Sequence, residues 1–297
     1  MIDDDPAAEV IGLVTRKGDR RILNDVSLRV ERGEILVIMG GSGSGKTTLL
    51  NHMLGLSRPD RGKTFLLGRE IHEIDDDDDV MELRTRTGTA FQSGGLLGSL
   101  SVLDNVLLPL RETSSMSEND AIDAARKALR LVGLSSSENK LPGELSGGMT
   151  KRAAFARAIV GKPEILFCDE PSAGLDPATA AALDQLILRI RDETGAAVVV
   201  VTHDLDSAFV VADRICVLDA GVALAIGTRE EIRRSSDPRI RALLDRRVEL
   251  ADDGFGVPRR PPPGAEEDCD PTKLRRMTVD DDDHPGDLAN DGRKSDE

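Results

Sequence analysis

Residues 40–48 read GGSGSGKTT, a stretch that combines four glycines with hydroxyl side chains and one lysine. Glycines let successive backbone N–H groups turn inward around an anion, and a helix that starts there adds its partial positive charge. The spacing satisfies the phosphate-loop pattern, in which the lysine neutralises the β- and γ-phosphates and the next hydroxyl completes a Mg²⁺ shell. The predicted phosphate contacts are Gly40, Gly41, Ser42, Gly43, Ser44, Gly45, Lys46, Thr47 and Thr48, with Thr47 also a metal ligand.

Two carboxylates follow the apolar stretch ILFC at residues 165–168. A buried strand that ends at Asp169 places this side chain beside the phosphate loop, and Mg²⁺ prefers carboxylate oxygens. A second carboxylate at Glu170 is not needed for the metal. We therefore predict that Glu170 takes a proton from the water that attacks the γ-phosphate, a role typically worth about 10² to 10⁴ in rate. The alternative is an ordinary acidic loop.

A third pattern, LSGGM at residues 145–149, precedes a helical stretch rich in Arg and Ala. Ser146 is a typical helix cap, and Gly147 and Gly148 leave backbone N–H groups available at the positive end of the helix. The stretch predicts a second anion site on the same chain. Taken alone, it is equally consistent with a simple helix cap.

Apolar stretches alternate with helical patterns along most of the chain, which predicts an α/β fold with a mainly parallel sheet covered by helices. Strands are expected at residues 26–30, 35–39, 64–67, 88–91, 165–168, 197–202 and 214–219. A turn at residues 31–34 predicts that the first two of these strands form a hairpin. Helices are expected at residues 46–56, 118–132, 149–160, 178–194 and 206–212. Another should start near residue 80, where the acidic run 75–79 suits a helix N-terminus better than a Ca²⁺ site.

The chain should divide into a domain at residues 1–248 and a tail at residues 249–297. The mostly helical stretch 94–160 interrupts the alternation and predicts an inserted subdomain. Residues 251–297 contain 14 acidic and 7 basic side chains, a net charge of 7 − 14 = −7, with few apolar residues. Such a segment cannot bury enough apolar area to offset its ordering entropy, so we expect it to be disordered.

Composition argues against several classes of protein. The net charge of −15 argues against general nucleic-acid binding, because the surface would repel phosphates. The apolar runs are much shorter than the roughly 18 to 20 residues of a membrane span, and the acidic N-terminus does not resemble a signal peptide, so a cytoplasmic location is expected. The cysteines lack CxxC pairing, which indicates reduced thiols, buried for Cys168 and Cys216. The third is Cys269.

These three patterns, with Gln92 after an apolar strand and His203 after a valine-rich one, resemble the ATP-binding subunit of an ABC transporter over about residues 9–248. LSGGM combined with ILFCDEP is specific to that family. The resemblance implies an ATPase with ATP and Mg²⁺ as cofactors. It also implies a P-loop NTPase fold with a RecA-like, mainly parallel sheet, an antiparallel β subdomain and an inserted helical subdomain.

The same resemblance implies that two copies stack head to tail, so that the LSGG helix of one covers the ATP held by the phosphate loop of the other. Gln92 would then sense Mg²⁺ and the attacking water, His203 would contact the γ-phosphate, and Asp176 would bridge the two subunits. The remaining histidines have no such context and are expected at the surface: His52, His72 and His284.

The adenine contact departs from the family pattern. Many relatives stack the base on an aromatic residue before the first core hairpin, whereas this chain has TRKG at residues 15–18. Arg16 or Lys17 would cover the ring through a cation–π contact of about 0.5 to 1 kcal/mol. The alternative is that neither side chain touches the base.

A narrower resemblance lies in FQSGGLL at residues 91–97, PLRE at 109–112 and DPRIR at 237–241. These motifs are similar to the ATPase of the Mla/Mce lipid-transport systems. They imply phospholipid transport with an integral membrane permease and an Mce lipid-binding protein, at the cytoplasmic face of the inner membrane. The alternatives are an ABC ATPase for amino acids or small hydrophobic cargo, and a soluble ATP-dependent switch. Four leucines are expected either to dock the permease or to pack in the core: Leu96, Leu97, Leu100 and Leu103.

Overall fold

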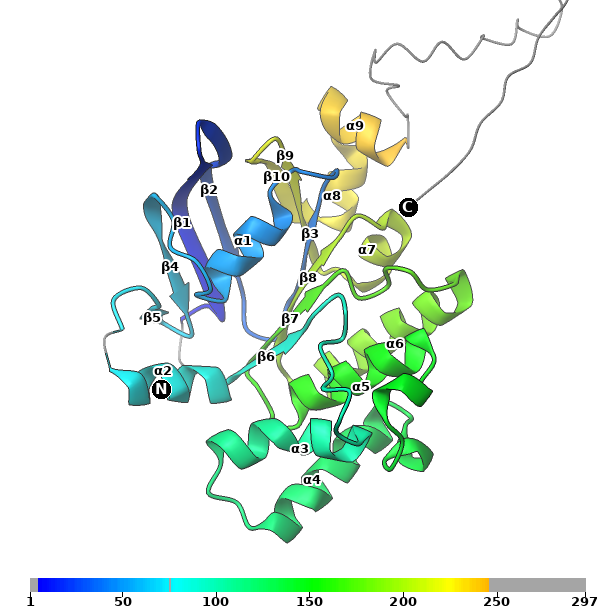
Figure 1. Ribbon diagram of the computed structural model, residues 1–297. Helices are drawn as coiled ribbons and strands as arrows, with labels where there is room; N and C mark the ends of the chain where they lie inside the picture. Colours follow the sequence, from blue (N-terminus) through cyan, green and yellow to red (C-terminus); the bar gives the residue numbers. More distant parts are fainter. Residues whose placement is uncertain (1–4, 75, 246–297) are drawn as a thin grey trace, which may run out of the picture. The chain divides into compact units, whose positions relative to one another are not determined.

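A computed structural model describes residues 5–74 and 76–245, and Figure 1 labels its elements. The strands are β1 (Ala8–Lys17), β2 (Arg20–Val30), β3 (Ile35–Met39), β4 (Arg61–Leu66), β5 (Arg69–Glu70), β6 (Thr87–Ala90), β7 (Ile165–Asp169), β8 (Ala197–Thr202), β9 (Arg214–Asp219) and β10 (Val222–Thr228). The helices are α1 (Lys46–Met53), α2 (Asp77–Thr85), α3 (Val102–Thr113), α4 (Glu118–Leu131), α5 (Gly147–Ile159), α6 (Pro177–Thr194), α7 (Leu205–Val211), α8 (Arg229–Arg234) and α9 (Pro238–Leu244). Two short 3₁₀ helices are η1 (Ser135–Ser137) and η2 (Pro142–Glu144).

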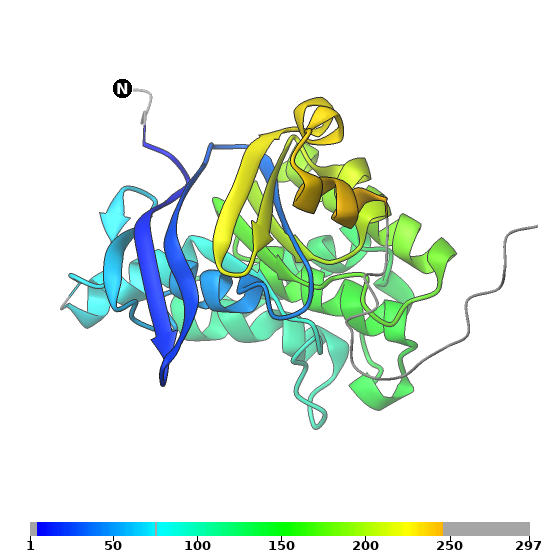
Figure 2. The same cartoon turned by 90° about the horizontal axis from the view of Figure 1, so that it is seen from above.

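The strands form two sheets. The larger has the order β10-β9-β3-β8-β7-β6, and all its strands are parallel except β10, which pairs antiparallel with β9. Figure 2 shows this yellow hairpin beside β3. The smaller sheet is antiparallel, with the order β2-β1-β4-β5. The predicted α/β class, with a mainly parallel sheet and an antiparallel β part, is confirmed.

The predicted hairpin between residues 26–30 and 35–39 is wrong. The partner of β2 is β1, with Ala8 opposite Val30, whereas β3 belongs to the larger sheet. The turn between them contains Gly33 at φ 69°, a conformation that costs glycine little. The chain uses this turn to leave one sheet and enter the other.

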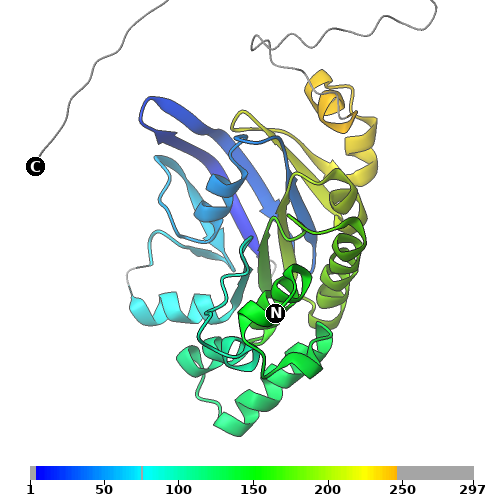
Figure 3. The ribbon, with the colours of Figure 1, turned by 45° about the vertical axis from the view of Figure 1, so that its right-hand side comes forward.

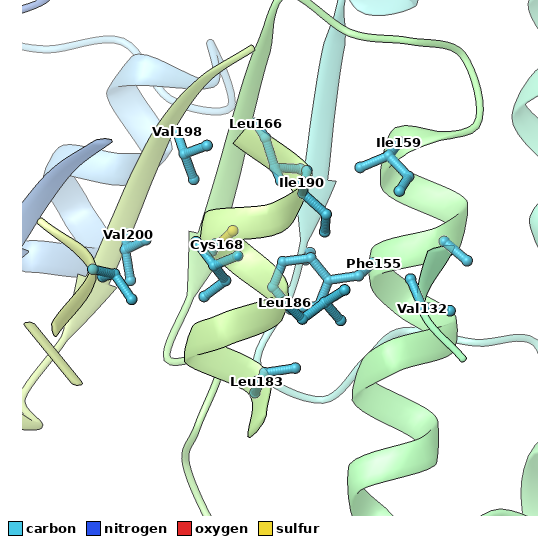
Figure 4. Packing of buried hydrophobic residues seen from close by; sticks show 14 of the residues in the cluster. Val132, Phe155, Ile159, Leu166, Cys168, Leu183, Leu186, Ile190, Val198 and Val200 are labelled. Carbon is cyan, nitrogen blue, oxygen red and sulfur yellow. The ribbon is translucent and has the colours of Figure 1, made fainter. Parts of the chain in front are cut away.

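The two faces of the large sheet carry different layers. Along β3, Leu36 and Ile38 join a core with α1 and the antiparallel sheet, whereas Val37 joins a second core with the helices of the 102–190 region. This alternation follows from the two-residue period of a strand. Figure 3 shows the dark blue strands β1 and β2, together with α1, to one side of the large sheet. In the second core, the Phe155 ring points from α5 toward Leu186 of α6 (Figure 4).

The segment between β6 and β7 contains α3, α4, η1, η2 and α5. Serine side chains cap its α-helices: Ser101 accepts from the Asp104 N–H, and Ser117 from the Asp120 N–H. Helix α2 begins at Asp77, inside the acidic run and three residues before the expected start. The Asp76 side chain caps it by accepting from the Asp78 N–H at 2.9 Å. The charges of this run therefore sit where they favour the helix dipole.

The cysteines and histidines of the described residues differ in exposure. Cys168 and Cys216 are buried free thiols, and burial raises both pKa values, that of Cys216 to about 12. His52 is not at the surface: only 1% of it is exposed, because it packs between α1 and β1. His72 is half-buried, and burial lowers its pKa. The predicted tail, including Cys269 and His284, lies outside the described residues, as does Asp75.

Candidate nucleotide-binding site

The phosphate loop connects β3 to α1. Gly45 caps α1 in a left-handed conformation, with φ 106°, which favours glycine. A Cβ at Gly40 would lie 2.0 Å from the Leu218 carbonyl oxygen, so a side chain cannot fit there. Gly41, Ser42, Gly43 and Thr47 are exposed, and Thr48 is half-buried. The loop is therefore tightly packed at Gly40 and open to solvent at Gly41, Ser42, Gly43 and Thr47.

Lys46 reaches back into this loop. Only 8% of the residue is exposed, and its Nζ donates to the carbonyl oxygens of Gly40 at 2.9 Å and Gly41 at 3.0 Å. Burial lowers the pKa of Lys46, while the carboxylates of Glu170 and Asp169 act in the opposite direction. The Ser44 Oγ is buried without a protein partner. The loop thus presents a cation and a free hydroxyl for an anion.

Asp169 ends β7 at the same edge of the sheet. Parallel pairing through β8 aligns Asp169 with Val201, and Val201 with Ile38 of β3. The Asp169 Oδ1 is buried and has no hydrogen-bond partner. Burial and the neighbouring Glu170 carboxylate raise the pKa of Asp169, against the attraction of Lys151 and Lys46.

This unpartnered carboxylate oxygen fits a hard cation such as Mg²⁺. Within residues 5–74 and 76–245 there is no cluster of three His, Cys, Asp or Glu side chains that could hold a metal alone. A cation at Asp169 would therefore complete its shell with the Thr47 hydroxyl, phosphate oxygens and water. Such a shell is typical of Mg²⁺ in phosphoryl-transfer sites.

Glu170 and His203 meet at the ends of β7 and β8. The Glu170 backbone has φ 46°, an uncommon conformation for a residue with a Cβ, and its N–H donates to the Val201 carbonyl at 2.8 Å. The His203 Nδ1 lies 2.9 Å from the Glu170 Oε2. Because a carboxylate only accepts, Nδ1 is the donor. Such local strain is often found at functional sites, where the surroundings hold the residue in place.

Gln92 follows β6 and is exposed. Its backbone carbonyl accepts from the Lys151 Nζ at 2.5 Å, and the same Nζ lies 3.2 Å from the Glu170 carbonyl. The structure therefore brings the backbone of Gln92 next to that of Glu170. Sequence reasoning missed Lys151, whose only signal was a lysine in the first turns of the helix after LSGG.

The LSGG residues form a separate group. Ser146 caps α5 by accepting from the Met149 N–H at 3.3 Å. A Cβ at Gly148 would lie 2.6 Å from Thr179 Cγ2, so glycine permits α5 to approach the start of α6. There the Thr179 hydroxyl donates to Asp176, which caps α6. Gly147 is exposed. Ser146, Gly147, Gly148 and Asp176 thus lie near one another.

The phosphate loop and the LSGG group belong to different layers of the fold. Helix α1, which carries Lys46 and Thr47, packs on β1, β4, β7 and β8, whereas α5 packs on β6, α3, α4 and α6. Their buried side chains fall in different cores on opposite faces of the large sheet.

The expected adenine contacts lie at the tip of the β1–β2 hairpin. Lys17 pairs with Arg20 across the hairpin and is exposed, and the Arg16 N–H donates to Asp60 at 2.6 Å. The neighbouring Thr15 hydroxyl bonds the buried His52 Nε2 at 2.7 Å. Neither Arg16 nor Lys17 has a side-chain hydrogen bond to the phosphate loop that would hold it in place over the adenine. The adenine contact stays a prediction.

A family model described as ABC transporter matches residues 23–173 of the chain. The chain belongs to the ABC transporter family. It is an ATPase subunit of that family, whose ATP-binding domain hydrolyses ATP. This agrees with the resemblance carried by the LSGGM and ILFCDEP motifs.

The names of known relatives of this ABC subunit refer to two different cargoes. The "probable ribonucleotide transport ATP-binding protein mkl" of Mycobacterium leprae is 42% identical over 81% of this chain and 69% of its own length. The "intermembrane phospholipid transport system ATP-binding protein MlaF" of Escherichia coli K12 is 38% identical over 77% of this chain and 85% of its own length. The chain spans about two thirds of the mycobacterial relatives.

A solved structure of the ATP-binding cassette MJ0796, a dimer in a post-hydrolysis state bound to ADP and Pi, matches with a TM-score of 0.68 and 32% identity. The match covers 74% of this chain and 98% of that cassette. In the part of this ABC subunit that the structure describes, no helix is both long and apolar enough to cross a membrane.

Proposed function

We propose that the chain is the Mg-ATPase subunit of a phospholipid transporter and that it works as a head-to-tail homodimer. The placement of the two anion-binding groups carries the dimer proposal: the phosphate loop and the LSGG group stand on helices of opposite layers. One chain therefore does not bring both groups to the same phosphate. A second copy in the opposite orientation would supply the missing group to each site.

In such a dimer, the residues of one chain hold and activate the reactants. Lys46 and the loop N–H groups bind the β- and γ-phosphates. The LSGG group of the partner subunit closes over the γ-phosphate. Asp169 and Thr47 would hold Mg²⁺, which supplies positive charge against the phosphate oxygens. Glu170 accepts the proton of the attacking water. His203, aligned by its 2.9 Å bond to Glu170, would contact the γ-phosphate, Gln92 would sense the metal and the attacking water, and Asp176 would face the partner subunit.

The permease would dock beside the segment that follows Gln92. Phe91 and Leu97 are 42% and 47% exposed, although both are large apolar side chains. A groove of about 370 Å³ is lined by Phe91, Pro109 and Arg157, among others. Leu96 and Leu103 instead pack against the core, and Leu100 is half-buried. Docking would therefore depend on Leu97 and Phe91 rather than on four leucines.

Phospholipid is the cargo that the narrower motifs and the likeness to MlaF support. An integral permease and an Mce lipid-binding protein would complete the assembly at the cytoplasmic face of the inner membrane. The name of the mkl relatives supports a ribonucleotide cargo instead. Co-purification of the assembly in mild detergent distinguishes these cases. Bound phospholipid supports the proposal, bound ribonucleotide other than ATP or ADP contradicts the cargo, and no retained membrane protein supports a soluble switch.

The dimer and the role of Glu170 are tested together by Glu170→Gln. The amide keeps an oxygen that accepts from His203 but cannot take a proton. We expect ATP binding to persist, hydrolysis to fall by about 10² to 10⁴, and an ATP-dependent dimer to accumulate on size exclusion. Glu164→Gln, just before the same strand, is the matched control and should hydrolyse ATP like the unmodified protein. A Glu170→Gln protein that hydrolyses ATP normally as a monomer would contradict the proposal.

A further inference from the structure

Lys151 contacts two loops of the predicted nucleotide site from a helix that lies outside both loops. It belongs to α5, the helix that starts with the LSGG glycines, and only 9% of it is exposed. Its Nζ donates to the carbonyl oxygens of Gln92 at 2.5 Å and Glu170 at 3.2 Å. One ammonium group therefore holds the loop after β6 and the loop after β7 at the same time.

Burying an ammonium group is costly unless charges or hydrogen bonds compensate it. Burial lowers the pKa of Lys151, and the nearby carboxylates of Asp169 and Glu170 oppose that shift. The lysine thus lies close to the predicted metal ligand and the predicted base. The packing of α5 is provided by apolar side chains such as Ala153, Phe155 and Ala156, which belong to the core, so it does not depend on a charge at position 151.

A second cation of α5 holds the same segment. Arg157 donates to the carbonyl oxygens of Gly94 at 2.9 Å and Gly95 at 2.6 Å. Residues 92–95 are therefore attached to α5 at three backbone carbonyls. The Gln92 side chain is exposed, so the position of its backbone decides where the side chain can reach.

We propose that Lys151 is a positioning residue for ATP hydrolysis, which fixes the backbone of Gln92 relative to that of Glu170 and makes both depend on the position of α5. The proposal rests on the proposed roles of Gln92 and Glu170. It adds a physical link between the LSGG helix and the hydrolytic residues of the same chain. In this role Lys151 acts through the two carbonyls that it contacts rather than on the nucleotide directly.

The test compares Lys151→Met and Lys151→Arg with Arg152→Met. Arg152 is the matched control, because it also lies on α5 and donates to backbone carbonyls, those of Val132 and Gly133. For Lys151→Met we expect kcat for ATP to fall at least tenfold, about 1.4 kcal/mol, with KM and the affinity for a fluorescent ATP analogue within about twofold. Lys151→Arg should restore kcat to within about threefold of the unmodified protein. Arg152→Met should keep kcat within about twofold.

A double-mutant cycle separates positioning from general structural damage. Because part of the effect of Lys151 passes through Gln92, Lys151→Met combined with Gln92→Ala should lower kcat by less than the product of the two single losses. Losses in kcat that simply multiply in the double variant would overturn the proposal. A Lys151→Met protein with normal kcat would also overturn it, as would a Lys151→Arg protein as slow as Lys151→Met. If Lys151→Met does not fold, Lys151→Gln takes its place with the same thresholds. Absence of hydrolysis in the unmodified protein would instead refute the proposed function.

Discussion

Asp169→Asn tests the metal site without depending on catalysis. The pKa of Asp169 is raised from its ordinary value of 3.8, first by burial and then by Glu170. These two effects therefore outweigh the attraction of Lys151 and Lys46, and the ionised carboxylate destabilises the protein in the absence of nucleotide. The amide is nearly the same shape and carries no charge. We expect the variant, without nucleotide, to be as stable as the unmodified protein or more stable.

The pH dependence has a definite sign. Because the folded-state pKa of Asp169 is raised, the folded protein binds more protons than the unfolded chain between pH 3.8 and that pKa, so its stability falls as pH rises through this window. Asp169→Asn should lack this fall. The stability gained by the variant should therefore be absent below pH 3.8 and fully present above the folded-state pKa of Asp169.

With Mg-ATP bound, the unmodified protein should become more stable than Asp169→Asn. At a ligand concentration of 100 times Kd, binding stabilises the folded state by about 2.7 kcal/mol. For a domain of this size, that raises the melting temperature by about 5 to 11 °C. Thermal unfolding with and without Mg-ATP should show this rise for the unmodified protein and for Asp192→Asn, an exposed control on α6. Asp169→Asn should lose most of it.

Two outcomes would contradict these expectations for Asp169. One is a melting temperature of Asp169→Asn, without nucleotide, more than about 4 °C below that of the unmodified protein, which corresponds to at least about 1 kcal/mol. Such a loss would mean that the Asp169 carboxylate is well compensated in the folded protein. The other is a full Mg-ATP shift in the variant, which would remove Asp169 from the metal site.

Three further changes have distinct expected results. Lys46→Ala should abolish binding of a fluorescent ATP analogue, because it removes the buried cation of the phosphate loop; retained binding would contradict that role. Phe155→Ala should lower the free energy of unfolding by about 3 to 5 kcal/mol in denaturant titrations, because the ring is 1% exposed in the core; a loss below 1 kcal/mol would argue against that packing. His52→Ala should cost about 1 to 3 kcal/mol by leaving the Thr15 hydroxyl and the Ser57 carbonyl without their partner, whereas a surface histidine would cost almost nothing.

The elements at the centre of the large sheet were predictable, because local signals and burial agree there. Strands β3, β7 and β8 are continuous apolar runs, as expected for parallel strands covered on both faces. The phosphate loop was predictable for a different reason: its glycines, lysine and hydroxyls have few uses together. The starts of two helices lie within one residue of the predictions, α6 at Pro177 and α7 at Leu205.

Partners distant in sequence were not predictable. The spacing of β2 and β3 is compatible with a hairpin, but β2 pairs with β1, which carries no strong alternation and was not predicted. His52 was assigned to the surface because nothing in the sequence brings Thr15 to it. The place of Lys151 after LSGG did not reveal its contacts, since its partners are backbone carbonyls 59 and 19 residues away. Backbone acceptors are the same at every position, so sequence cannot identify which of them a lysine reaches.

The two proposals together explain why one helix carries both LSGG and Lys151. Along α5, Lys151 lies four residues after Gly147, which is about 6 Å at 1.5 Å per residue. A helix transmits displacement along its length because its backbone is hydrogen-bonded throughout. If the nucleotide of the partner subunit moves the start of α5, Lys151 must move with it, and so must the carbonyls of Gln92 and Glu170. Closure over one ATP would then adjust the hydrolytic residues at the other, which couples the two sites without any contact between their nucleotides.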